Sequence, residues 1–248
     1  MDHVFLETFS SLPRQGPGSF KSTEKAYKSC ANLPDNANIL DIGCGRGKQT
    51  FDLATLSKGT ITAIDINEPF IEMVNQEAVR LGLSNRLIAS VCDMNDIPYA
   101  LQSFDLIWSE GAVYIMGFEK GLYLWKPFLK KNGYLVISDV AWFKTEIPEE
   151  VKEFWAMECP DLDVKDAASN IKSIEKAGYR LIDSFKLPEE AWWNDFYTPL
   201  QKRIQTLREK YSDDQKAIDV LEMIQHEIDM YKKYHEYYGY MFYVMQNG

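Results

Sequence analysis

The chain has few cysteines and no arrangement of them that builds a site. Its 248 residues include four cysteines, scattered with no Cys-x-x-Cys pair: Cys30, Cys44, Cys92 and Cys159. Scattered thiols match neither a disulfide framework nor a zinc site. We therefore expect reduced, buried cysteines.

The chain also lacks an excess of positive charge and any long apolar run. It carries 27 Lys and Arg against 37 Asp and Glu, a net charge of −10. An acidic protein has no electrostatic footprint for a polyanion, so nucleic acid is not an expected partner. No run approaches the ~20 residues of a membrane span, and no basic, apolar leader opens the chain. We expect a cytoplasmic protein with no membrane span.

What the chain does contain is an alternation of short β-rich runs with longer helical patterns. This alternation is typical of an α/β domain with a parallel sheet, and the length favours one domain over residues 1–248. Helices are predicted around 47–57, 69–82, 118–130 and 166–177. Strands are predicted at Asn38–Ile42, Thr60–Asp65, Leu87–Val91, Phe104–Ser109, Gly133–Val140 and Arg180–Leu187.

Three segments lie outside the regular core of residues 38–187. Residues 1–37 contain the turn-forming run Arg14–Ser19 and a predicted helix over Ser22–Ala31, and they could form a flexible arm or a lid. Residues 188–236 open with an aromatic cluster and continue as two amphipathic helices, which predicts a helical cap. Residues 237–248 are strand-like and are expected to pair at the sheet edge.

The run NILDIGCGRGKQT, residues 38–50, places three glycines after the first predicted strand. A phosphate-binding P-loop is excluded, because Ile42 stands where its first glycine belongs and Gln49 where its hydroxyl belongs. A dinucleotide turn requires a small residue where Lys48 stands. The pattern that remains is Asp-x-Gly-x-Gly-x-Gly.

With this pattern the chain resembles the class I S-adenosylmethionine-dependent methyltransferases, in particular the small-molecule enzymes of the ubiquinone/menaquinone-biosynthesis group (methyltransferase types 11 and 25). The resemblance implies a Rossmann-like, seven-stranded sheet flanked by helices. It would be mostly parallel, with an antiparallel last strand and a helical insertion before that strand. It also implies S-adenosylmethionine as cofactor and S-adenosylhomocysteine as product.

The resemblance assigns cofactor contacts to positions of this chain. The acid and glycines of the turn would meet the methionine part, Asp65 the ribose hydroxyls, and Ile66 and Asp93 the adenine. A Gly-Pro-Gly turn near the N-terminus would close over the methionine carboxylate. The expected cofactor residues are Arg14, Gly16, Gly18, Ser19, Asp41, Gly43, Gly45, Gly47, Asp65, Ile66, Asp93, Met94, Ser109 and Gly111.

In methyl transfer the protein positions the two reactants, excludes water and, for some acceptors, supplies a base. Glu110 ends the strand nearest the transferred methyl in this family, so it is the first candidate for a base, with Tyr114 the second. A helix cap for Glu110 and core packing for Tyr114 remain equal alternatives.

Aromatic residues late in the chain suit a cap over an apolar or aromatic acceptor, or a cage for a cation, although core packing remains an alternative. The candidates are Trp142, Trp192, Trp193 and Tyr197. A catechol-type metal site would need Asp-Asn where Asp139-Val140 stands, so no metal is expected.

The expected function is methyl transfer to a small molecule by in-line displacement in a closed pocket. Two alternatives remain at this point: a methyltransferase that modifies proteins, and a protein that binds the cofactor without catalysis. The acceptor atom is open, and so is the choice between a monomer and a homodimer.

Overall fold

The computed structural model describes residues 3–160 and 162–248. Their sheet has the strand order β3-β2-β1-β4-β5-β7-β6, with parallel pairs from β3 to β5 and with β7 antiparallel to both neighbours. This arrangement confirms the predicted Rossmann-like sheet. The strands are β1 (Asn38–Ile42), β2 (Thr60–Asp65), β3 (Leu87–Val91), β4 (Phe104–Glu110), β5 (Leu129–Trp142), β6 (Tyr179–Lys186) and β7 (Tyr238–Asn247).

Helices connect the strands largely where periodicity predicts them. They are α1 (His3–Ser10), α2 (Phe20–Ser29), α3 (Lys48–Leu56), α4 (Glu68–Arg80), α5 (Phe118–Trp125), α6 (Glu149–Glu158), α7 (Ala167–Lys176), α8 (Glu190–Trp192), α9 (Thr198–Lys210) and α10 (Gln215–Tyr234). The helix predicted over 118–130 ends early, because Pro127 lacks the amide hydrogen that would continue it. The strand β5 therefore begins at Leu129 rather than Gly133.

Helices cover both faces of the sheet. Side chains alternate between the two faces along a strand, so adjacent residues of β1 belong to different cores. Ile39 lies in one hydrophobic cluster with Leu53 of α3. Leu40 lies in the other, with Leu122 of α5 and Ile174 of α7. The sheet is thus buried on both sides, which leaves the strand ends as the place for a ligand.

The position of β7 differs from the prediction. The last strand was expected at the sheet edge, but it lies between β5 and β6, and β6 forms the edge. Its residues Phe242, Tyr243, Val244 and Met245 are all fully buried. An uninterrupted apolar run is typical of a strand covered on both faces, which explains the interior position.

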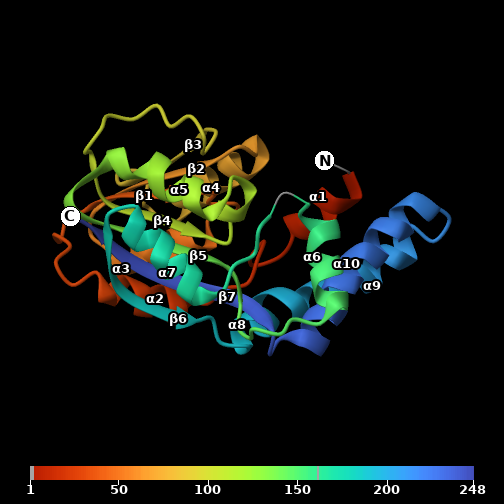
Figure 1. Cartoon of the computed structure of the whole chain (residues 1–248). Helices are drawn as coiled ribbons and strands as arrows, with labels where there is room; N and C mark the ends of the chain where they lie inside the picture. Colours follow the sequence, from red (N-terminus) through yellow and green to blue (C-terminus); the bar gives the residue numbers. More distant parts are fainter. Residues whose placement is uncertain (1–2, 161) are drawn as a thin grey trace.

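A group of helices forms a cap beyond one end of the sheet. Figure 1 shows α1, α6, α9 and α10 gathered there. The helix α1 packs on α9 and α10, and Phe154 of α6 meets His226 of α10 edge to face. The predicted apolar stripes of the two long helices are buried, at Leu200, Ile204, Leu207, Leu221, Ile224 and Ile228. The cap therefore joins α1 and α6 to the predicted segment 188–236.

Candidate active site

The loop after β1 is a turn that requires glycine. Gly43, Gly45 and Gly47 have φ angles of +71°, +53° and +79°. A side chain is disfavoured in this left-handed region. A Cβ at Gly43 would also lie 2.4 Å from the Cβ of Ala112. The turn thus lets other groups approach its backbone closely.

A cavity of about 380 Å³ lies against this turn, at the carboxyl ends of the parallel strands. We call it the first cavity. It combines the glycine turn with the loops after β2, β3 and β4 and with the N-terminal segment. The predicted cofactor residues that line it are Arg14, Gly16, Gly43, Gly45, Asp65, Ile66, Asp93, Met94 and Gly111.

Asp65 closes β2 at the rim of the first cavity. One of its carboxylate oxygens accepts the backbone N–H of Gly45 at 2.8 Å, and the other accepts that of Asn67 at 2.9 Å. These bonds hold the carboxylate beside the glycine turn. The next side chain, Ile66, is 73% exposed although it is apolar. An exposed apolar side chain beside an oriented carboxylate suits a ligand with both a flat apolar part and hydroxyl groups.

Asp93 and Met94 follow β3 on the same side of the first cavity. Asp93 accepts the backbone N–H and the side-chain amide of Asn95, both at 2.8 Å. These hydrogen bonds lower the pKa of Asp93. The carboxylate is therefore ionised at neutral pH and can accept further hydrogen bonds from a ligand.

Glu110, at the end of β4, is the centre of a buried ion network. Its carboxylate accepts hydrogen bonds from the Thr23 hydroxyl at 2.8 Å and the Trp108 indole at 2.9 Å. Arg14 lies 3.3 Å from it and also pairs with Asp52 at 2.7 Å. Burial raises the pKa of Glu110, and the Arg14 guanidinium opposes that rise. The network fastens the N-terminal segment to the end of β4.

The N-terminal segment reaches the glycine turn through Gln15 as well. Its side-chain oxygen accepts the backbone N–H of Arg46 at 3.1 Å, and its amide donates to the Phe9 carbonyl at 3.3 Å. Arg14, Gln15, Gly16 and Pro17 all line the first cavity. The segment thus forms part of the wall of the first cavity.

Asp41, predicted to contact the cofactor, has a fully buried side chain and is not among the residues that line the first cavity. One oxygen accepts the Thr50 hydroxyl at 2.5 Å, which ties β1 to α3. The other has no hydrogen-bond partner within the described residues. Burial raises the pKa of Asp41 to about 7.

Four further predicted residues do not line the first cavity, because each has a structural partner. Gly47 starts α3, where a Cβ would lie 2.9 Å from Val74. Ser109 is buried and donates to the Ile42 carbonyl at 3.0 Å. Gly18 donates its N–H to the Ala191 carbonyl, and the Ser19 hydroxyl caps α2.

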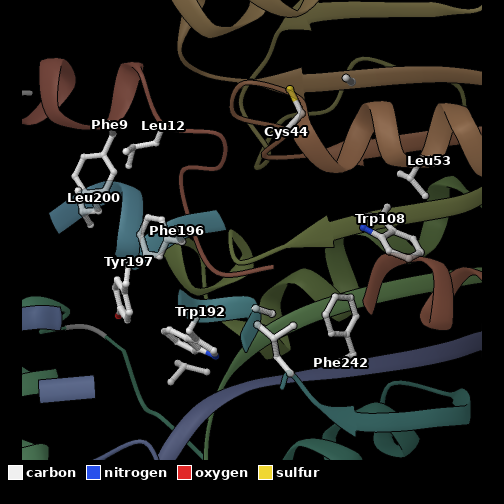
Figure 2. Close-up of a cluster of buried hydrophobic side chains, with 14 of the residues drawn as sticks. Phe9, Leu12, Cys44, Leu53, Trp108, Trp192, Phe196, Tyr197, Leu200 and Phe242 are labelled. Carbon is white, nitrogen blue, oxygen red and sulfur yellow. The ribbon is translucent and has the colours of Figure 1, made fainter. Parts of the chain in front are cut away.

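A second cavity, of about 260 Å³, lies under the cap. Most of its aromatic lining comes from α1, α6, the segment from α8 into the turn Trp193–Tyr197, and the start of β7; Phe70 and Tyr114 add to it. Figure 2 shows Trp192, Phe196 and Tyr197 of this segment, with Phe9 of α1 beside Phe196. Two predicted substrate residues, Trp192 and Tyr197, line the cavity. Such a lining suits an apolar or aromatic small molecule.

The other two predicted substrate residues lie outside this cavity. Trp142 packs edge to face on Tyr238, with ring centres 6.4 Å apart. Trp193 packs against Tyr197 and Tyr231. Trp142 thus packs on β7 and Trp193 packs within the cap, and neither is among the residues that line the second cavity. The turn at Trp193–Tyr197 is π-helical, which changes which side chains of this segment point inward.

The two cavities meet. Gly16, Phe70, Gly111 and Tyr114 are among the residues that line both. Burial raises the pKa of Tyr114 to about 12, so its phenol stays protonated at neutral pH. Tyr114 therefore stands where a group in one cavity would face a group in the other.

Glu227 lines the second cavity and was not singled out in the sequence. It lies in α10, three residues after Ile224 and four before Tyr231, which are both buried. This spacing puts a carboxylate on the apolar face of an amphipathic helix. A charge on that face was the available signal for a site residue.

The sheet topology and the glycine turn are those of a class I S-adenosylmethionine-dependent methyltransferase. A family described as "Methyltransferase domain" matches residues 33–203. The chain belongs to this methyltransferase family, which confirms the class that the sequence motifs predict.

Solved structures share the whole fold. A methyltransferase from Geobacter sulfurreducens, crystallised with S-adenosyl-L-homocysteine, has a TM-score of 0.84 at 18% identity and covers 100% of this chain and 99% of its own. One from Thiobacillus denitrificans with the same ligand has a TM-score of 0.84 at 19% identity, with the same coverage. At these identities the likeness concerns the fold.

Curated relatives match over shorter stretches. The 27-O-demethylrifamycin SV methyltransferase of Amycolatopsis mediterranei is 32% identical over 32% of this chain and 29% of its own length. The methyltransferase GfsG of Streptomyces halstedii is 26% identical over 53% of this chain and 47% of its own length. The chain thus spans less than half of either relative.

Proposed function

We propose that the chain binds S-adenosylmethionine in the first cavity and transfers its methyl group to a small molecule held in the second. The observation that carries this proposal is the junction of the two cavities at Gly16, Gly111 and Tyr114. A methyl donor and an acceptor must meet in line within a space that excludes water. The name of a relative, the 27-O-demethylrifamycin SV methyltransferase, supports a small-molecule acceptor.

The residues of the first cavity fit this cofactor. Asp65 would accept the ribose hydroxyls, Ile66 would cover the adenine face, and Asp93 would accept the adenine amino group. Gly43 and Gly45 would let the methionine part approach the backbone. When bound, the cofactor supplies a methyl carbon that its positive sulfur has already activated. The carboxylates of the cavity also suit a cationic cofactor.

The chain's own part in the reaction is positioning. Tyr114 carries a protonated phenol at the junction and can donate a hydrogen bond to the acceptor. Glu110 is engaged by Thr23, Trp108 and Arg14. We assign it the role of holding the N-terminal segment over the cavity, so that water is excluded during transfer.

Calorimetry with S-adenosylmethionine and S-adenosylhomocysteine tests the proposal, followed by a methylation screen against a metabolite library. We expect binding of both and turnover of a small molecule. Absence of binding would overturn the proposal. Binding without turnover would favour the non-catalytic alternative, and turnover of peptides alone would favour protein modification.

A matched pair of variants locates the binding. Asp65→Ala removes the carboxylate beside the glycine turn, and we expect at least about a tenfold loss of S-adenosylhomocysteine affinity. Asp35→Ala changes an exposed aspartate before β1 and serves as the control. Equal affinity of the two variants would place the cofactor elsewhere.

A further inference from the structure

The described part of the chain lines the second cavity with an acidic side chain and with no basic one. Of the described residues that line it, Glu227 alone carries a charge, and no lysine, arginine or histidine is among them. A phosphate, sulfate or carboxylate group in this cavity would therefore meet a carboxylate and no cation. The lining thus disfavours an anionic acceptor.

Glu227 also lacks a cationic partner. Its Oε1 accepts a hydrogen bond from the Tyr197 hydroxyl at 2.9 Å, and no described lysine, arginine or histidine pairs with it. The titratable groups that interact with it are acids: Glu158, the Cys159 thiol, Tyr114, and tyrosines of the cap and β7. The adjacent His226 is exposed and acts on Glu158 instead. Burial raises the pKa of Glu227 to about 7.

Aromatic rings line the same cavity as this carboxylate. Trp155 meets Tyr238 edge to face with centres 5.4 Å apart, and Trp192 meets Tyr240 at 4.9 Å. All four line the second cavity. The faces of tryptophan and tyrosine attract cations, most strongly where water is excluded. The Tyr238 hydroxyl has no hydrogen-bond partner within the described residues and can accept one from a ligand.

We propose that the acceptor is a small amine on an apolar or aromatic body, whose ammonium group binds Glu227 and the aromatic faces around it. This inference rests on the proposed function, because it describes the molecule that the second cavity would hold. An ammonium supplies the positive charge that the cavity lacks and donates to the carboxylate. For transfer to that nitrogen, the ammonium would first pass a proton to the Glu227 carboxylate, and the neutral amine would then attack the methyl carbon as the bond from that carbon to sulfur breaks. A neutral alcohol or phenol would donate one hydrogen bond but leave the negative charge uncompensated.

The test uses the full chain saturated with S-adenosylhomocysteine. The probes are 2-phenylethylamine and 4-phenylbutylamine, each with the alcohol and the carboxylate of the same carbon skeleton. Calorimetry measures the six affinities. We expect each amine to bind at least about tenfold more tightly than its alcohol, and the carboxylates not to bind. Equal binding of amine and alcohol, binding of the carboxylate, or no amine binding would overturn the inference.

Two variants of α10 assign the preference to one side chain. Glu227→Gln keeps the shape and removes the charge, so the preference for amine over alcohol is expected to vanish while cofactor-product affinity stays within about twofold. Asp229→Asn changes an exposed acid of the same helix and should keep the preference. An unchanged preference in Glu227→Gln would overturn the inference.

The outcomes separate this inference from the proposed function. Failure of S-adenosylhomocysteine to bind the wild-type chain would contradict the proposed function itself. Binding of S-adenosylhomocysteine together with a preference for alcohols or acids would contradict the amine acceptor alone. The wild-type comparison remains decisive if Glu227→Gln does not fold.

Discussion

Buried carboxylates are the most distinctive single residues of this molecule. Burial raises the pKa values of Asp41, Glu110, Asp139 and Glu227. Glu110 alone among these four pairs with an arginine within the described residues. A carboxylate without a cation is costly to bury, so each of these groups marks a place where the fold or a ligand must compensate.

Asp139 of β5 gives a prediction for the pH dependence of stability. Burial raises its pKa from 3.8 to about 7, so the folded state binds this proton more tightly than the unfolded state. Its contribution is therefore most favourable below about pH 4 and is lost as pH rises toward 7. We expect Asp139→Asn to flatten the fall in unfolding free energy over this interval, as measured by urea unfolding at several pH values.

The exposed Asp213 provides the control for this measurement. Asp213→Asn should leave the wild-type pH profile in place. A profile of Asp139→Asn that coincides with that of the wild type would contradict the assignment of the slope to Asp139.

Two glycines with nearly equal φ angles allow the effect of backbone strain to be measured apart from the effect of a steric clash. Gly43 has φ +71° and Gly82 has φ +69°, but only a Cβ at Gly43 would collide with a neighbour. We expect Gly82→Ala to cost about 1 kcal/mol of stability without affecting S-adenosylhomocysteine binding. Gly43→Ala should weaken that binding at least about tenfold, measured by calorimetry. Equal affinities would show that the turn does not approach the ligand.

Among the elements, the segment before α2 depends most on contacts distant in sequence. Arg14 bridges Asp52 of α3 and Glu110 of β4 while itself almost fully buried. Together with Gln15, it brings a turn-rich stretch against the glycine loop. Such a stretch has little helix or strand propensity, so these contacts determine its path.

Arg14→Met should destabilise the protein strongly, because it leaves the buried Glu110 without its cation and removes one of the two cations that pair with Asp52, the other being Lys48. Removing one partner of a buried pair costs about 3–5 kcal/mol. Arg80→Met removes an exposed partner of Glu77 and should cost much less stability than Arg14→Met, because solvent screens an exposed ion pair. Urea unfolding of both variants measures the difference. Similar losses in the two variants would mean that the Arg14 network contributes little.

For the whole molecule, the two joined cavities couple ligand binding to stability. A ligand at about 100 times its Kd adds about 2.7 kcal/mol to the folded state. For a chain of this size, that corresponds to a rise in Tm of roughly 5–10 °C. We expect S-adenosylhomocysteine to produce such a rise in a thermal melt, and NADH to produce none. A rise in Tm with NADH would indicate that the glycine turn binds a dinucleotide.

The sequence predicted the helices and strands of the core well, because their signals are local. It missed α1 and α6, because their apolar faces are short and are recognisable only from their packing in the folded chain. There α1 packs on α9 and α10, and α6 packs on α10. Within the glycine motif, Asp41 contacts α3 and Gly47 lies against α4, and the local sequence does not show that neither lines the first cavity.

The sequence by itself determined the β/α alternation, the glycine turn and the acids that end β2 and follow β3. These features depend on periodicity and on backbone angles, which neighbouring residues control. Tertiary structure alone decided that β7 enters between β5 and β6, that Arg14 reaches Glu110, and that Glu227 faces an aromatic cavity. Each joins residues far apart in the chain, and only packing of the whole molecule determines which of them share a buried space.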